Sequence, residues 1–352
     1  MVNDDGPPSH RLSPYIHPFV NALQDAGHLV SVAIPASSRS WIGKAHLIEA
    51  SLEATYVPPS AFRNDGTWDT TSPSTEGEEK GNEWVVISNG TPASCVQLGL
   101  FNLFPPDSPK GPIDLIISGP NHGRNASTIY NLSSGTVGGA LEAATCGKRG
   151  IAISFGSKDP QPAETIGAAA RLAVRVVEYL ARNWDERVEL YNLNIPMRED
   201  VKGRPVRYTK ALPYYWAKGY LYSEIPADES SHGHEGLCNG SSAESKKLVN
   251  GTAVNDTTNG TVSSKPASGL KKRSFKWAAE LSDMKKALQA SEEGTDAHTV
   301  LNGCTRYGSL SLFFFFFSLS LILQSANENS ITPLLANFWH VPGLEGQLNL
   351  DD

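Results

Sequence analysis

The sequence has few cysteines and no excess of positive charge. Its four cysteines among 352 residues lie far apart and form no C-x-x-C pair, which argues against a zinc finger and against a disulfide framework. Lysine and arginine number 30 against 37 acidic residues, giving a net charge of −7. Without a basic excess, the chain is not expected to bind duplex nucleic acid by neutralising its phosphates. The first ten residues carry neither a basic nor an apolar run, so we expect no signal peptide and a cytoplasmic protein.

Motifs of several enzyme classes are absent as well. The nine histidines form neither H-x-x-x-H nor H-E-x-x-H, which disfavours zinc-dependent hydrolysis. No G-x-S-x-G occurs, so an α/β-hydrolase triad is disfavoured. The phosphate loops G-x-x-x-x-G-K-[ST] and G-x-G-x-x-G are also missing, which weakens the P-loop and dinucleotide hypotheses.

Short apolar runs alternate with helical patterns over roughly the first two hundred residues. The runs are rich in β-branched residues and are bounded by Gly, Pro or Ser, which is typical of strands buried on both faces. Between them, apolar residues recur at helical spacing. The expected strands are 29–34, 84–87, 113–117, 151–155 and 190–195, and the expected helices are 14–26, 135–146 and 165–183. This alternation predicts an α/β fold with a mainly parallel sheet.

Three segments interrupt this pattern. Residues 63–82 and 228–273 are polar, and we expect solvated insertions there. The second of them holds four N-x-[ST] sequons, which would accept glycans if the protein were secreted and otherwise arise by chance.

The third segment, 304–329, is rich in phenylalanine. Its uncharged run Tyr307–Leu323 is 17 residues long, against about 20 for a membrane span. A membrane anchor is therefore an alternative, although membrane association is not the favoured reading. Five consecutive phenylalanines imply a pyrimidine-rich coding run such as precedes a splice site, so a retained intron is our hypothesis for this segment.

Polar residues gather where the expected strands end. Asp4 and Asp5 are followed by glycine and two prolines, which continue neither a strand nor a helix. Ligands of α/β proteins bind outside the carboxyl ends of the strands. Adjacent carboxylates there suit a hard cation such as Mg²⁺ or Mn²⁺, whose charge relieves their repulsion. The alternative for such a sequence is a solvated turn.

Three further groups are expected at the same edge. Asn121 and Asn125 follow the strand 113–117, and Ser40 follows the strand 29–34. Ser134 and Thr136 open a helix, where free N–H groups and the helix dipole favour an anion. Each group alone also fits an ordinary loop or a helix N-cap. Their joint position on one side of a parallel sheet indicates a cation and phosphate site.

Taken together, these motifs resemble the SurE-like phosphatases, which are also called 5′/3′-nucleotidases. They occur in the order of that family and cover most of the chain outside the insertions. The segments SPYIHPF and RSWIGKAH are more similar to the eukaryotic branch of the family. Some members of that branch carry a tubulin–tyrosine ligase domain. The stretches that carry the resemblance are Asn3–Gly6, Arg39–Ser40, Asn89–Cys95, Ser118–Asn121 with Asn125, Ser134–Thr136, Asn192–Pro196, Gly294–His298 and Ser330–Pro333.

The resemblance implies a Rossmann-like three-layer sandwich with a C-terminal β-hairpin extension, forming one domain over residues 1–345. It implies an enzyme that removes phosphate from nucleoside monophosphates and other small phosphomonoesters, by in-line attack of water and with one divalent cation, Mg²⁺ or Mn²⁺. It also implies a homodimer. The implied metal ligands are Asp4, Asp5, Ser40 and Asn121, of which the two aspartates are also catalytic, and the implied phosphate-binding residues are Asn125, Ser134 and Thr136.

One departure from the family pattern supports an alternative. Only Met1 and Val2 precede Asn3, whereas a strand usually needs about 5–6 residues. A first strand that is missing would leave Asp4 and Asp5 poorly positioned, and small misplacements are costly to catalysis. The alternative function is therefore a catalytically impaired SurE-like binding protein, or the product of a truncated gene model.

Overall fold

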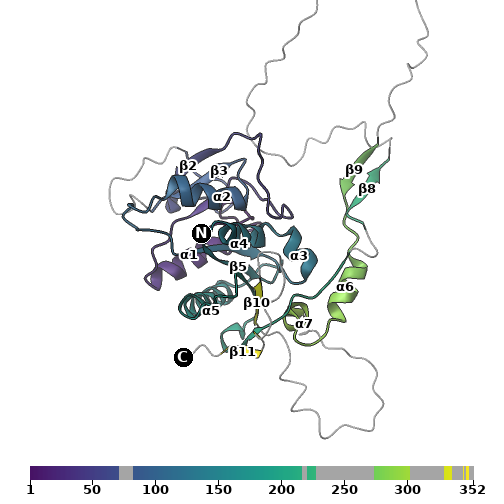
Figure 1. Ribbon diagram of the computed structural model, residues 1–352. Coiled ribbons are helices and arrows are strands. Elements are labelled where there is room, and N and C mark those ends of the chain that lie inside the picture. Colours follow the sequence, from purple (N-terminus) through teal and green to yellow (C-terminus); the bar gives the residue numbers. More distant parts are fainter. Residues whose placement is uncertain are drawn as a thin grey trace, which may run out of the picture. The chain divides into compact units, whose positions relative to one another are not determined.

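A computed structural model describes most of the chain (Figure 1). It covers residues 1–70, 82–215, 220–226, 273–301, 329–334, 344 and 346–348. Residues 71–81 of the first interrupting segment lie outside the described residues. So do nearly all of 228–273 and 304–329, including the sequons and the run Tyr307–Leu323, and the interpretations of those segments stay predictions. The chain divides into two compact units, residues 1–215 with 284–352, and residues 216–283. The single domain over 1–345 also stays a prediction.

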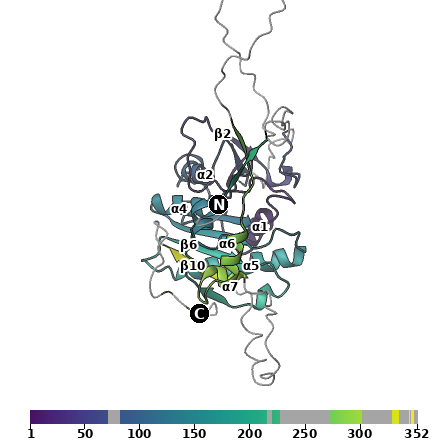
Figure 2. The same ribbon diagram turned by 90° about the vertical axis from the view of Figure 1, so that its right-hand side faces the viewer.

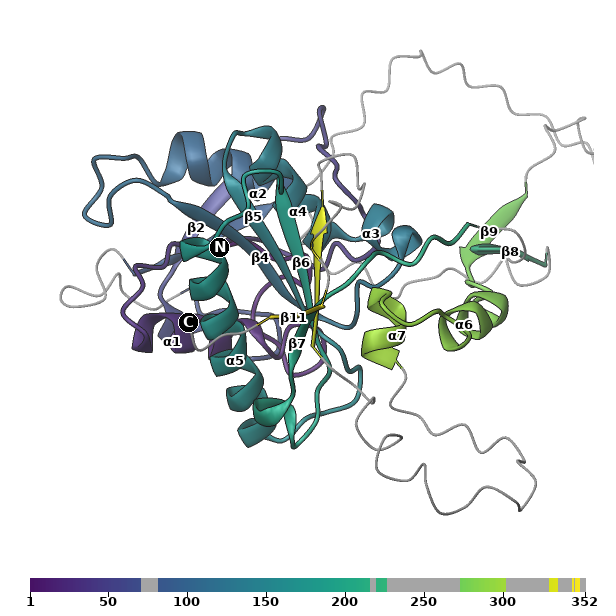
Figure 3. The same ribbon diagram turned by 60° about the horizontal axis from the view of Figure 1, so that its bottom comes forward.

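The first unit contains a six-stranded sheet that is parallel at its centre. Its strands are β4 (Leu115–His122), β5 (Arg149–Phe155), β6 (Leu190–Ile195), β7 (Val206–Tyr208), β10 (Asn329–Leu334) and β11 (Gly346–Leu348). Their order in the sheet is β11-β7-β10-β6-β5-β4. Strands β4, β5 and β6 are parallel and lie side by side in Figure 3, whereas β10 runs antiparallel to β6. The parallel strands therefore bring their carboxyl ends to one edge.

A smaller sheet of three strands continues this layer. It consists of β1 (Ala33–Pro35), β3 (Trp84–Ser88) and β2 (Glu53–Val57) in the order β1-β3-β2. Met1 and Val2 connect the two sheets through backbone hydrogen bonds. On one side, the N–H of Ala33 donates to the Met1 carbonyl at 2.9 Å; on the other, the N–H of Val2 donates to Ile117 and Gly119 donates to Val2, at 2.9 and 2.8 Å. Two residues thus take the place of the expected first strand and fix the direction in which the chain leaves toward Asp4.

Helices cover both faces of the sheet and complete three layers (Figure 2). Helices α1 (Ile16–Asp25) and α5 (Ala163–Arg182) pack on one face, and α2 (Pro92–Leu98) and α4 (Gly135–Thr145) pack on the other. Apolar residues at helical spacing bury one side of α5. Helix α4 is followed by Gly147, whose positive φ of 70° is typical of a helix C-terminus. Shorter elements are α3 (Thr128–Ser133), α6 (Ser282–Gln289), α7 (Asp296–Leu301), the 3-10 turns Pro59–Ala61 and Val201–Gly203, and the π-helical turn Gly99–Leu103.

The second unit contains an antiparallel pair of strands. Strand β8 (Tyr222–Ile225) pairs with β9 (Ser274–Trp277), with Tyr222 opposite Trp277. The rings of Tyr222 and Trp277 meet edge to face, with centroids 5.5 Å apart. These extra strands confirm the expected C-terminal extension, and the parallel central sheet between helices confirms the expected fold class.

Most expected elements are present, with two kinds of difference. The strand expected over 29–34 is instead the shorter strand Ala33–Pro35, which is paired in parallel with β3. Strand β2 and the short helix α3 were not expected, since neither contains a continuous apolar run or a clear helical stripe. No helix among the described residues is long and apolar enough to cross a membrane.

Substitution of Phe155 tests the packing between the sheet and α1. Its ring is fully buried, with centroids 5.3 Å from Tyr15 and 6.3 Å from Phe19. We expect Phe155→Ala to lower the free energy of unfolding by about 3–5 kcal/mol, because it leaves a cavity in the core. Phe101, which is 66% exposed, is the matched control. Phe101→Ala should change the free energy of unfolding by less than about 0.5 kcal/mol. Equal effects in urea denaturation would contradict this packing.

Candidate functional site

The two aspartates predicted as metal ligands lie at the carboxyl edge of the sheet. Val2 is bridged in parallel to Ser118 of β4, so Asp4 and Asp5 leave the sheet beside the end of that strand. Both are buried, at 3% and 4% exposure. The alternative of a solvated turn is therefore wrong for this sequence.

Asp4 is held by the start of α4 and by the loop after β1. The Thr136 hydroxyl donates to Oδ1 of Asp4 at 2.5 Å, and the backbone N–H of Arg39 donates to the Asp4 carbonyl at 2.6 Å. A Cβ on Gly135 would lie 2.7 Å from the Asp4 Cβ, so only glycine permits this approach. The N-terminus of α4 thus lies directly against the first carboxylate.

Asp5 is held by the end of β4. The backbone N–H of His122 donates to Oδ2 of Asp5 at 2.7 Å. The ladder between β4 and β5 is irregular between Ser118 and Asn121, as in a β-bulge, which re-aims the end of a strand. This irregularity lies next to Asn121 and shapes the segment that meets Asp5.

The two carboxylates form an electrostatically costly pair. Burial raises the pKa of Asp4. Burial also raises the pKa of Asp5 well above its usual range, and the neighbouring charge of Asp4 adds to this shift. The hydrogen bonds from Thr136 and His122 act in the opposite direction but do not cancel it. A divalent cation between the carboxylates would supply the missing positive charge.

The surrounding donors fit a hard cation. Among the described residues, no cluster of three or more His, Cys, Asp or Glu side chains could hold a metal ion. A cation here would therefore take two carboxylates and complete its shell with hydroxyl, amide or water oxygens. Mg²⁺ and Mn²⁺ accept such a set, whereas structural zinc prefers Cys and His.

Ser40 and Asn121, the two other predicted ligands, border this pair to different degrees. Asn121 is mostly buried and stands next to His122, which bonds Asp5. Ser40 is exposed, and its hydroxyl lies 3.2 Å from that of Ser38. Its neighbour Arg39 donates its backbone N–H to the Asp4 carbonyl, so Ser40 is one residue from a direct contact with Asp4.

The loop that carries Ser40 is fixed to α4. Lys44 Nζ lies 2.6 Å, and His46 Nε2 3.3 Å, from Oε2 of the buried Glu142. Gln97 donates to the other carboxylate oxygen at 2.6 Å. Burial alone would raise the pKa of Glu142, but the hydrogen bonds from Lys44, Gln97 and His46 lower it. This carboxylate stays ionised and holds the loop against the helix.

Of the predicted phosphate-binding residues, Asn125 lies in a buried amide network. Its backbone N–H donates to Oδ1 of Asn194 at 2.9 Å, and its Nδ2 donates to the Ser154 hydroxyl at 2.9 Å. Its carbonyl accepts from Nδ2 of Asn192 and Asn194, at 2.7 and 3.1 Å. The residues Asn192, Asn194 and Ser154 were not predicted as site residues, although Asn192–Pro196 was part of the family resemblance.

Ser134 and Thr136 have structural partners. The Ser134 hydroxyl caps α4 by accepting from the N–H of Val137 at 3.1 Å, which is the N-cap role left open by the sequence. Thr136 bonds Asp4, a contact that the sequence did not indicate. Both hydroxyls nevertheless stand at the helix end that meets Asp4.

The buried Asp296 ties distant segments together behind this region. Its carboxylate accepts from the N–H groups of Ser127 and Leu212, each at 2.9 Å, and of Ala297 at 2.7 Å. Burial raises the pKa of Asp296 to about 6, and these three N–H groups oppose the shift. Its role is thus to position the loop before α3.

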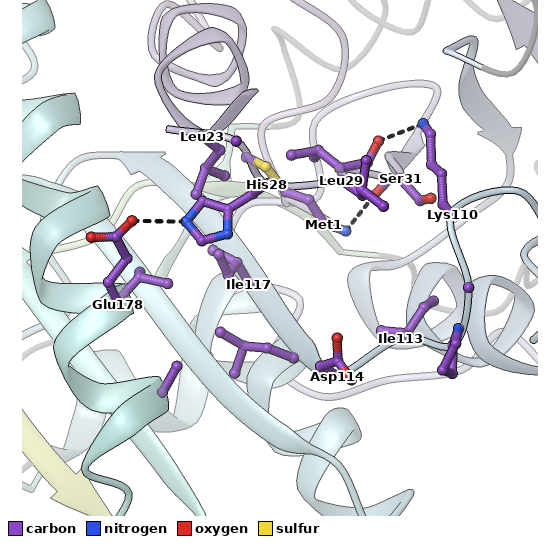
Figure 4. Close-up of a pocket in the computed structure, with 17 residues that line it drawn as sticks. Met1, Leu23, His28, Leu29, Ser31, Lys110, Ile113, Asp114, Ile117 and Glu178 are labelled. Carbon is purple, nitrogen blue, oxygen red and sulfur yellow. Dashed lines mark hydrogen bonds and ion pairs between the residues drawn. The ribbon is translucent and has the colours of Figure 1, made fainter. Parts of the chain in front are cut away.

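A pocket of about 400 Å³ lies at the opposite end of the strands (Figure 4). Its lining includes Met1, Leu29 and Asp114, which directly precedes β4. Lys110 donates to the carbonyl of Val30 at 2.7 Å, and His28 pairs with Glu178 at 3.1 Å. This pocket is at the amino ends of the strands and is separate from the aspartates.

Comparison with known proteins supports the family. The family model described as survival protein SurE matches residues 1–218. The chain belongs to the SurE family. It is 32% identical over 245 residues to the 5′-nucleotidase SurE of Rhodopirellula baltica, covering 65% of this chain and 84% of that protein.

Two further similar proteins concern the branch of the family and the fold. The chain is 36% identical over 223 residues to the probable tubulin–tyrosine ligase PBY1 of Saccharomyces cerevisiae, covering 57% of this chain. The match spans only 29% of the yeast protein's length, and it fits the expected eukaryotic branch. The crystal structure of a SurE protein from Aquifex aeolicus matches with a TM-score of 0.53 and 21% identity, over 95% of this chain and 92% of that one. This likeness supports the fold.

The cost of the carboxylate pair predicts an unusual effect on stability. A raised pKa in the folded state stabilises the protein at low pH, and this contribution is lost as pH rises through the folded-state pKa. We therefore expect Asp5→Asn, in EDTA at pH 7, to raise the free energy of unfolding by roughly 0.5–2 kcal/mol.

Thermal unfolding at several pH values measures this effect. The wild type in EDTA should lose more stability than Asp5→Asn between about pH 4 and neutrality, where carboxyls with raised pKa values ionise. The exposed Asp114 gives the matched control, Asp114→Asn, which should follow the wild type. Parallel curves for wild type and Asp5→Asn would contradict the predicted repulsion.

Proposed function

We propose that this chain is a divalent-metal-dependent phosphomonoesterase that acts on nucleoside monophosphates. The observation that carries the proposal is the buried pair Asp4 and Asp5, placed against the N-terminus of α4 at the carboxyl edge of the sheet. Membership of the SurE family makes the chain a phosphoric monoester hydrolase, since its relatives from bacteria and archaea are named 5′-nucleotidase SurE. The nucleotide substrate is carried over from those names.

The residues proposed to hold the cation are Asp4, Asp5, Ser40 and Asn121. A divalent cation bound there would offset the charge of both the carboxylates and the substrate phosphate, which otherwise repel each other. Thr136 and the His122 N–H keep the two carboxylates in place by their hydrogen bonds. The residues of the chain thus supply a pre-organised, water-poor acidic edge.

The phosphate group of the substrate is proposed to lie between Asn125 and the start of α4. The first N–H groups of this eleven-residue helix and its dipole favour an anion. Ser134 and Thr136 add hydroxyl groups at the same place, and the amide network around Asn125 holds that residue rigidly. A water molecule would attack the phosphorus in line with the leaving alcohol, beside Asp4 and Asp5. Formation of a homodimer stays a prediction.

Phosphate release from nucleoside monophosphates and from p-nitrophenyl phosphate tests the proposal directly. We expect turnover with Mn²⁺ or Mg²⁺ and none in EDTA. Asp5→Asn should lower kcat/KM by about 10²-fold or more, since removing preorganised charge at the reacting group is costly. Asp114→Asn should retain wild-type activity.

Two outcomes would count against the proposal. Full activity in EDTA would show that no cation is needed. Absence of any turnover, with the folded protein still binding nucleotides, would favour the alternative of a binding protein without catalytic activity.

The affinity for the cation should depend on pH. Burial raises the pKa of Asp4, and burial together with the Asp4 charge raises the pKa of Asp5, so protons must leave before the carboxylates bind a cation. Affinity for Mn²⁺ should therefore increase from pH 5 to pH 8, with release of protons. Calorimetric titration in buffers of different ionisation enthalpy counts those protons, and a pH-independent affinity would contradict this account.

A further inference from the structure

The loop after β5 reaches the same edge as the two aspartates. Gly156 donates to the carbonyl of Ile195 at 2.8 Å, and Ser157 donates to Phe155 at 2.9 Å. Tyr15 donates its hydroxyl to the carbonyl of Ser157 at 3.4 Å. The backbone on the amino side of Lys158 is therefore anchored, while the Lys158 side chain is exposed.

Lys158 lies over Gly123, directly beside Asn121. A Cβ built on Gly123 would lie 3.0 Å from Cε and 3.3 Å from Nζ of Lys158, and 3.4 Å from Nδ2 of Asn121. The ammonium and the amide group thus face the same small space, which exists because residue 123 has no side chain. Both groups carry hydrogen-bond donors, which suits an anionic acceptor.

The charge of Lys158 acts on the acidic pair. Burial raises the pKa of Asp4 and of Asp5, and the Lys158 charge opposes that shift at both residues. The same charge adds to the effect of burial in lowering the pKa of His122. The ammonium is therefore within electrostatic reach of Asp4, Asp5 and His122.

We propose that Lys158 contacts the substrate, its ammonium and the Asn121 amide group together taking oxygens of the phosphate. This inference rests on the proposed phosphomonoesterase function and adds a cation to a phosphate pocket that otherwise consists of neutral donors. An ammonium is a strong point-charge partner for phosphate. The ammonium comes from the loop after β5, whereas the neutral donors come from the start of α4 and from Asn125.

The alternative is that the Lys158 side chain is solvated and only offsets the negative charge of the aspartates. The two alternatives differ in what happens to phosphate and to the cation. If Lys158 binds phosphate, its removal weakens phosphate binding but leaves Mn²⁺ binding equal or tighter, because a positive charge near the carboxylates is gone. If it is only solvated, phosphate binding does not change.

Three variants test the proposal with the full-length chain. For Lys158→Met, we expect a loss of about 10-fold to 10²-fold in kcat/KM, and a comparable loss in affinity for inorganic phosphate measured by calorimetry in saturating Mn²⁺. Lys158→Arg should recover most of both. Gly123→Ala should lower both at least as much as Lys158→Met, because its Cβ would displace the Lys158 side chain and would also strain the backbone at a φ of 143°.

The double variant sharpens this test. If Gly123→Ala acts through Lys158, combining it with Lys158→Met should add little further loss, a non-additivity that independent sites do not show. Lys148→Met is the matched control. Lys148 directly precedes the first residue of β5, whereas Lys158 follows its last, and Lys148 donates to the Ile113 carbonyl. It should leave phosphate affinity unchanged.

The outcomes separate this inference from the function on which it rests. An active wild type with equal phosphate affinity in Lys158→Met and Lys148→Met would overturn the role of Lys158 and leave the function standing. A fully additive double variant would overturn the proposed action of Gly123 through Lys158. A wild type that neither hydrolyses phosphate esters nor binds phosphate would overturn the function itself.

Discussion

The structure around the site depends on two carboxylates that are buried next to each other. Burying Asp4 and Asp5 opposes folding. The protein reduces this cost with one fixed donor to each carboxylate, and a third segment holds the Asp4 backbone. The Thr136 hydroxyl bonds Asp4, the His122 N–H bonds Asp5, and the Arg39 N–H bonds the Asp4 backbone. These segments come from α4, β4 and the loop after β1, so the acidic pair can exist only once the whole layer is assembled.

Much of the fold and part of the site could be predicted from the sequence. Strands β5 and β6 were predicted almost residue for residue, because strands buried on both faces give continuous apolar runs. Strand β2 could not be predicted in this way, since four of its five residues are exposed or half-buried and the sequence there has no such run. The edge at which the aspartates lie followed from a geometric rule, that parallel strands share their carboxyl ends.

The contacts within the site were beyond sequence reasoning. The bond between Thr136 and Asp4 depends on a close approach at Gly135, and a glycine before a helix has many other uses. Lys158 stands in a Gly-Ser-Lys-Asp loop that would be read as solvated anywhere else. To predict either contact, one must know how close two segments lie that are far apart in the sequence. A pattern along the sequence does not give that distance.

The amide network behind the start of α4 has a consequence for catalysis. Asn125, Asn192, Asn194 and Ser154 hold one another through neutral groups, none of which gains or loses a proton in the range where enzymes work. The wall that Asn125 forms therefore keeps its shape and its charge from mildly acidic to mildly alkaline solution. A bell-shaped rate profile for this enzyme would accordingly report groups outside this network, such as the acidic pair, and not a change in the network itself.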